Sequence, residues 1–291
     1  MNAFVLSATG PSFISHASLD PPPAFTASTY VIGSSTGALR ALLAFFGRSE
    51  AELADAYCAM TWRPWSTPAS LTAMMRRNVR IVVPEAASER GLIDAPSKII
   101  PVVVVTCPRF GMPPLLFVFL CAVAYMVGLG RFVVYSLAHM DVYVPTWCDR
   151  RTFPLEFEPD VRWRFRDLTS DNVEEVLYAS TRIPGISNAS PLGCDGGCMF
   201  YHCNGSPRRD FRVNVEAKIH ERAFLQRAMF DARPIDPAVH VSTIHGRHPR
   251  VISLLDWFHP LYVMFPRRRW LKWKSQESDL PVETYINSKK W

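Results

Sequence analysis

The ten residues from Val31 to Arg40 place a serine between two glycines, directly after a short apolar segment. They read V-I-G-S-S-T-G-A-L-R and match the pattern G-x-S-x-G at Gly33, Ser35 and Gly37. This pattern is typical of a sharp strand-to-helix turn that holds a serine hydroxyl above the N-terminal end of the helix. Glycine is needed on both sides because the turn is strained and neighbouring segments approach closely. The run therefore predicts a strand over Tyr30 to Ile32, a helix from about Thr36, and Ser35 as a candidate nucleophile.

The early position of this turn restricts the fold. An α/β-hydrolase places several strands before its nucleophile, and the residues before Ser35 are too few to supply them. If Ser35 is a nucleophile, we expect a serine hydrolase in which the turn comes near the start of the domain.

Composition narrows the class of protein further. The chain has 291 residues, of which 48% are hydrophobic and 20% charged, enough for one large α/β domain or two small ones. Mean hydropathy near zero excludes a disordered chain and a polytopic membrane protein. The net charge of +6 would suit an anionic membrane surface or a nucleic acid. Outside the C-terminal tail the basic residues form no extended stripe, so we expect no nucleic-acid partner.

Strand and helix patterns alternate along the chain, which predicts a mostly parallel sheet flanked by helices. The β-branched run at 102–105 is typical of a strand covered on both faces. No repeat or clear linker divides the chain, so we expect a single domain. The expected strands are 4–7, 30–32, 98–106 and 251–255, and the expected helices are 36–46 closed by Gly47, 49–61, 68–77, 171–179 and 214–232.

Residues 110–130 contain no charged side chain, and 115–129 is almost wholly apolar. Pro113 and Pro114 suit a helix start. One interpretation is a helix packed on the sheet or lying at an interface, and the other is membrane insertion, although the stretch is shorter than the ~20 residues that span a bilayer.

Seven cysteines and an N-terminus without the basic region of a signal peptide indicate a reducing, cytoplasmic environment with free thiols. Cys194, Cys198, His202 and Cys203 lie close together in the sequence. Their spacing matches no usual zinc motif, and adjacent residues would struggle to face one ion, so we expect no metal.

A nucleophilic serine needs a base. Six of the eight histidines lie in no recognisable catalytic context, and although His16 lies near the first loop and His202 follows the glycine turn, each is expected to be a surface or structural histidine. The alternative base is Asp195, because an aspartate followed by Gly196 and Gly197 can be held on a turn with its carboxylate presented to a serine.

These motifs together resemble those of the patatin-like phospholipases, most closely a bacterial-type branch. Gly33 to Arg40 is similar to that branch's G-S-S-x-G-A-x-R, and Asp195 to His202 to its D-G-G-x-x-x-Y-H. The stretch Ala179 to Gly185 is similar to the A-S-x-x-I-P-G segment that precedes the aspartate in this family. The resemblance covers roughly residues 4–265.

The resemblance implies a three-layer α/β fold and a lipid acyl hydrolase with a catalytic dyad. Ser35 would be the nucleophile and Asp195 the general base, and no metal, histidine or cofactor would be required. Backbone N–H groups of Gly10, Ser12 and Phe13 would form the oxyanion hole. The domain would cover 1–265, lacking an N-terminal piece of the family, and 266–291 would form a basic, aromatic tail.

The loop at residues 8–13 departs from the family pattern. It keeps one glycine, carries no charge and includes Pro11, which has no N–H to donate. The alternative function is therefore a weak or inactive patatin-like protein that binds lipid or a protein partner at a membrane. The apolar stretch 112–130 and the tail segment 265–274 are the expected membrane contacts, peripheral or integral. The sequence gives no indication of the oligomeric state.

Overall fold

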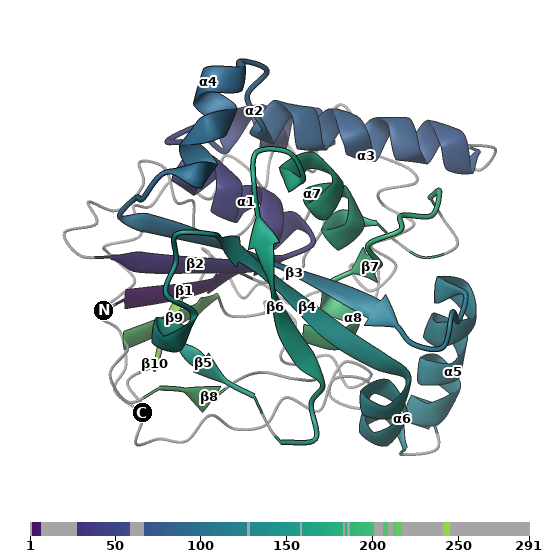
Figure 1. The fold of residues 1–291 in the computed structure, drawn as a ribbon. Coiled ribbons are helices and arrows are strands. Elements are labelled where there is room, and N and C mark those ends of the chain that lie inside the picture. Colours follow the sequence, from purple (N-terminus) through teal and green to yellow (C-terminus); the bar gives the residue numbers. More distant parts are fainter. Residues whose placement is uncertain are drawn as a thin grey trace.

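The computed structural model describes residues 2–6, 28–58, 67–126, 129–157, 159–182, 184, 187–200, 206–208, 212–216 and 241–244. These residues form a mixed sheet with helices on both faces (Figure 1). The strands are β1 (Asn2–Leu6), β2 (Thr29–Ser34), β3 (Ile99–Pro108), β4 (Ala138–Pro145), β5 (Leu155–Glu156), β6 (Trp163–Leu168), β7 (Cys194–Asp195), β8 (Ser206–Pro207), β9 (Arg212–Glu216) and β10 (Val241–Ile244). The helices are α1 (Thr36–Phe45), α2 (Ala51–Cys58), α3 (Pro68–Val82), α4 (Ala87–Arg90), α5 (Pro114–Met126), α6 (Gly130–Leu137), α7 (Val173–Thr181) and α8 (Gly197–Phe200), with 3₁₀ turns η2 (Gly91–Asp94) and η3 (Arg150–Thr152).

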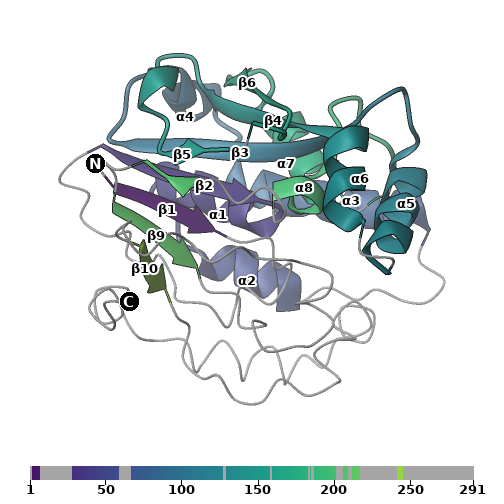
Figure 2. The same ribbon diagram turned by 90° about the horizontal axis from the view of Figure 1, so that it is seen from below.

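The main sheet has the strand order β10-β9-β1-β2-β3-β4-β6, which can be followed in Figure 2. The pairs are parallel except that β4 and β7 run antiparallel to β3. The expectation of a mostly parallel sheet flanked by helices is therefore confirmed. The central strand β3 is buried on both faces, as its β-branched run predicted.

Two apolar clusters cover the two faces of the sheet. On one face Val103 and Val105 of β3 pack with α1, α3 and α7. On the other face Val102 and Val104 pack with Phe117 of α5, Val134 of α6 and Met199 of α8. This alternation along β3 is the two-residue period of a strand.

Several expected elements form with altered bounds. Helix α1 ends at Phe45, and Gly47 follows it with φ of 63°, the left-handed conformation that glycine adopts readily. Helix α2 begins at Ala51, whose N–H donates to the Ser49 hydroxyl. Helix α3 runs to Val82, five residues beyond the expected end, and α7 begins at Val173.

Two expectations were wrong. The single helix expected over 115–129 is two helices, because α5 ends at Met126 and α6 begins at Gly130. Within the described part of the chain, no helix combines the length and the apolar character that crossing a bilayer requires. The helix expected from Asn214 is wrong at its start, where β9 lies between β1 and β10 in the sheet and pairs with both strands. The strand expected at 251–255 lies outside the described residues.

Candidate active site

The Ser35 hydroxyl donates a hydrogen bond to Oδ2 of Asp195, over 2.8 Å. The two residues are 160 positions apart in the sequence. Ser35 is only 8% exposed, and Asp195 is partly buried. The two side chains that the sequence singled out as nucleophile and base are therefore in direct contact.

Strand β3 brings these two residues together. Strand β2 pairs with β3 as far as Ser34, which lies opposite Val104. Strand β7 pairs with the next residues of β3, so that Asp195 lies opposite Val105. Because β4 already occupies the opposite edge of β3 at this level, β2 and β7 must follow each other along the same edge. The turn after β2 consequently meets the aspartate in β7.

The backbone at Ser35 is strained. Its φ of 54° and ψ of −128° lie outside the regions that non-glycine residues prefer, and such strain persists only where the surrounding structure enforces it. A Cβ atom on Gly33 would lie 2.1 Å from the carbonyl oxygen of Gly37. The glycine at position 33 is therefore required by the close return of the chain, as predicted.

The aspartate turn has an equally close approach. A Cβ atom on Gly196 would lie 2.0 Å from the carbonyl oxygen of Val104. The next residue, Gly197, donates its N–H to Oδ1 of Asp195 over 2.7 Å. One carboxylate oxygen thus accepts a hydrogen bond from the backbone, and the other accepts a hydrogen bond from the Ser35 hydroxyl.

Burial sets the proton affinity of the aspartate. Desolvation raises the pKa of Asp195 and outweighs the hydrogen bonds from Ser35 and Gly197, which lower it, so that the pKa moves from 3.8 to about 6. A base with a pKa close to the working pH combines an ionised ground state with useful proton affinity. Asp195 has the properties of a general base near neutral pH.

Ser180, at the end of α7, holds both halves of the site. Its hydroxyl accepts the N–H of Ser35 over 3.1 Å and donates to the carbonyl oxygen of Val104 over 2.7 Å. Its carbonyl oxygen accepts the N–H of Gly196 over 3.2 Å. In the sequence, Ser180 belongs to a segment that resembles the family's A-S-x-x-I-P-G stretch. No local sequence signal predicts that its hydroxyl holds the Ser35 turn.

Arg40 and Glu50 form a buried ion pair behind the nucleophile turn. Nε of Arg40, which is 1% exposed, donates to Oε1 of Glu50 over 2.7 Å. This pair ties α1, whose first residue follows Ser35, to the chain that enters α2. Arg40, the last residue of the G-S-S-x-G-A-x-R stretch, therefore links α1 to the residue that precedes α2.

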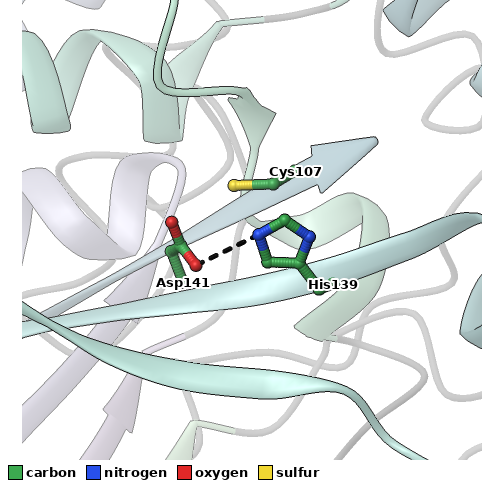
Figure 3. Close-up of side chains that lie close together, drawn as sticks. All are labelled: Cys107, His139 and Asp141. Atoms are coloured by element: carbon green, nitrogen blue, oxygen red, sulfur yellow. Dashed lines mark ion pairs between the residues drawn. The ribbon is translucent and has the colours of Figure 1, made fainter. Parts of the chain in front are cut away.

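A group of possible metal ligands lies beside the aspartate turn (Figure 3). The ligand atoms of Cys107, His139 and Asp141 all lie within 4.8 Å of one another, on β3 and β4. Arg164 already binds both carboxylate oxygens of Asp141, and Nε of Arg166 lies 3.3 Å from Oδ2. The carboxylate is thereby neutralised, and a divalent cation would be repelled by two adjacent guanidinium groups. We interpret this group as an ion-pair network joining β4 to β6.

The Cys194, Cys198, His202 and Cys203 group, in which no metal was expected, is only partly described. Cys194 and Cys198 are free thiols, and the hydrogen bond to Cys194 together with burial raises the pKa of Cys198. His202 and Cys203 lie outside the described residues, as do the expected oxyanion residues Gly10, Ser12 and Phe13 and the tail segment 265–274.

Comparison with known proteins gives this chain no relative: no family model, no curated protein and no solved structure matches it.

Proposed function

We propose that this chain is a serine hydrolase that cleaves carboxylic esters of lipids through a Ser35–Asp195 dyad. The observation that supports this most directly is the 2.8 Å hydrogen bond from the Ser35 hydroxyl to Asp195. A strained turn presents the serine, and a carboxylate with a pKa near 6 accepts its proton. The resemblance to patatin-like phospholipases supports the same assignment from the sequence.

The reaction would proceed in two halves. Asp195 takes the Ser35 proton while Oγ attacks the ester carbonyl carbon, and the protonated Asp195 then gives that proton to the departing alkoxide. An acyl ester on Ser35 remains. Asp195 next deprotonates a water molecule that attacks this ester, and the proton returns to Oγ as the fatty acid leaves.

Negative charge on the carbonyl oxygen would need hydrogen-bond donors. The resemblance assigns this role to backbone N–H groups of Gly10, Ser12 and Phe13. Because Pro11 contributes no N–H, this loop is where the chain departs most from an efficient hydrolase, and we expect slow turnover.

The proposed substrate class rests on the resemblance and on the apolar helices α5 and α6, which follow β3 in the chain. Helices α5 and α6 carry large exposed apolar side chains at the end of the sheet where β3 leads into α5 (Figure 1). Long acyl chains and the membranes that contain them suit such a surface. A lipid or ester is therefore the proposed substrate, with peripheral membrane contact through 112–130 and, from the sequence alone, through 265–274.

A labelling experiment with a fluorophosphonate probe tests the dyad, because only an activated serine reacts. We expect the wild-type chain to be labelled and to hydrolyse esters, and Ser35→Ala and Asp195→Asn each to lose both properties while remaining folded. The matched control is Ser34→Ala. The Ser34 hydroxyl is buried, and no described group bonds to it, so this change should leave labelling intact.

Full activity in either dyad variant would contradict the mechanism. A folded wild-type chain that resists labelling would instead support the alternative function, a non-catalytic patatin-like protein that binds lipid or a protein partner.

A further inference from the structure

Helices α5 and α6 present an exposed surface made of large apolar side chains. Phe110 before α5 is 76% exposed, Phe119 on α5 is 61% exposed and Phe132 on α6 is 72% exposed. We call this surface the α5–α6 apolar face; its exposed residues are Phe110, Leu115, Leu116, Phe119, Val123, Leu129 and Phe132. Such a group of exposed apolar side chains usually marks a binding surface.

The spacing along α5 separates this face from the core. Leu115, Phe119 and Val123 recur every four residues and share the outer side of the helix. On the inner side Phe117 and Ala124 are buried. A helix that is apolar all round is expected to be covered on every side, but in the described part of the chain Leu115, Phe119 and Val123 of α5 stay exposed.

The turn that leads into α5 holds an aromatic ring outward. Phe110 has a φ of 60°, which is strained for an aromatic residue. The guanidinium of Arg109 lies 4.6 Å from the centre of its ring. Backbone strain that places a phenylalanine in solvent, beside a fixed positive charge, indicates a functional contact.

The chemistry of the face selects one occupant. None of its seven side chains can donate or accept a hydrogen bond, whereas a protein interface contains about one hydrogen bond per 100–200 Å². Residues 108–138 include two arginines and no acidic residue, which complements anionic lipid headgroups. Hydrocarbon bordered by anionic headgroups satisfies both properties.

We propose that the α5–α6 apolar face docks the protein on an anionic bilayer surface, with Phe110, Phe119 and Phe132 entering the acyl region. This inference rests on the proposed function in taking a lipid surface as the place of reaction. The buried side of α5 shares a cluster with Met199 of α8, and α8 begins two residues after Asp195. Docking by the outer side of α5 therefore brings the dyad near the membrane that holds its substrate.

Flotation with phosphatidylcholine–phosphatidylserine vesicles tests the proposal, using the full chain. The double variant Phe119→Asp/Phe132→Asp should bind at least tenfold more weakly for each phenylalanine replaced, because each loses the burial of a large apolar side chain. The matched control is Leu92→Asp in η2, on the other side of the sheet, where Leu92 is also 53% exposed. This control should bind like the wild type, and all variants should hydrolyse a water-soluble short-chain ester equally.

Three results would overturn the proposal: unchanged binding by the double variant, equal loss with Leu92→Asp, or a wild-type dimer that the double variant disrupts without any vesicle binding. Ser35→Ala separates this proposal from the proposed function. If Ser35→Ala and the wild type both bind vesicles but the wild type hydrolyses no ester, the docking surface stands and the dyad fails.

Discussion

Asp195 combines two properties that oppose each other. The proposed reaction needs it ionised, yet its environment favours the neutral form, because desolvation is the largest influence on its pKa. Folding therefore costs free energy that an uncharged residue would not cost. Such a conflict between stability and activity is expected of a buried catalytic base.

The replacement Asp195→Asn should stabilise the protein at pH 8 while abolishing labelling. The wild-type pKa rises from 3.8 in the unfolded chain to about 6 in the folded one, so wild-type stability falls as pH increases through that window. Asparagine does not titrate and avoids this loss. Relative to the wild type, the free energy of unfolding should therefore rise by about 3 kcal/mol at pH 8, and the difference should vanish below about pH 4. Thermal unfolding at both pH values measures it.

The pH dependence of wild-type fluorophosphonate labelling tests the same pKa. The labelling rate should fall about tenfold per pH unit below pH 6, as Asp195 becomes protonated. A labelling rate that is flat between pH 5 and 8, or an Asp195→Asn variant that is less stable at pH 8, would contradict the assigned pKa.

Among the elements, α1 is a buried helix that supplies one partner of a buried ion pair. Arg40 points into the core and is paired there with Glu50, at the start of the next helix. A buried pair of this kind adds little to stability over an apolar pair, but loss of one partner is costly. The effect of the pair is to hold α1 against the segment that leads into α2.

Replacing Glu50 by alanine should lower the free energy of unfolding by about 3 kcal/mol, since the buried guanidinium loses the carboxylate bonded to Nε. The matched control is Glu52→Ala, two residues on, where an exposed pair with Arg48 is worth less than about 1 kcal/mol. Urea unfolding of both variants measures the difference. Equal midpoints would show that the buried pair is not needed.

For the molecule as a whole, the candidate active site is the meeting point of three distant segments. The turn with Ser35 follows β2, the proposed base lies in β7, and Ser180 lies in the last turn of α7. The Ser180 hydroxyl joins the backbone N–H of Ser35 to the central strand β3. The site is consequently sensitive to a side chain that takes no part in the proposed chemistry.

We expect Ser180→Ala to cost about 2 kcal/mol of stability, because the Ser35 N–H loses its acceptor in a buried site. Fluorophosphonate labelling should slow at least tenfold as the strained turn relaxes. Thr181→Val is the control: this hydroxyl bonds only carbonyl oxygens of its own helix, at Leu177 and Tyr178. Labelling rates that match in the two variants would argue against a positioning role for Ser180.

The nucleophile turn, the aspartate turn and most helices near them could be predicted because their signals are local. Pro68 fixes the backbone at a helix start, and Gly33 and Gly47 allow a close approach and a positive φ that other residues would resist. Strands were harder. β4 was not predicted, and β6 was missed although Trp163 and Phe165 alternate with Arg164 and Arg166 as in a half-buried strand.

Strand β9 shows why local signals fail. Asn214 and Val215 lie in a stretch with a helix-like pattern of charge, but they pair with β1 as part of β9. The outcome depends on a partner more than two hundred residues earlier in the chain. The break between α5 and α6 is similar, since apolarity alone gives no information on where a helix ends.

The sequence by itself determined which residues could act: Ser35 by its flanking glycines, and Asp195 by the two glycines after it. Only the tertiary structure decided that the two side chains meet. Their contact depends on β2 and β7 following each other along one edge of β3, with Val104 and Val105 as their neighbours. Strand register over such a separation is set by pairing and packing of the whole sheet, and no short stretch of sequence contains it.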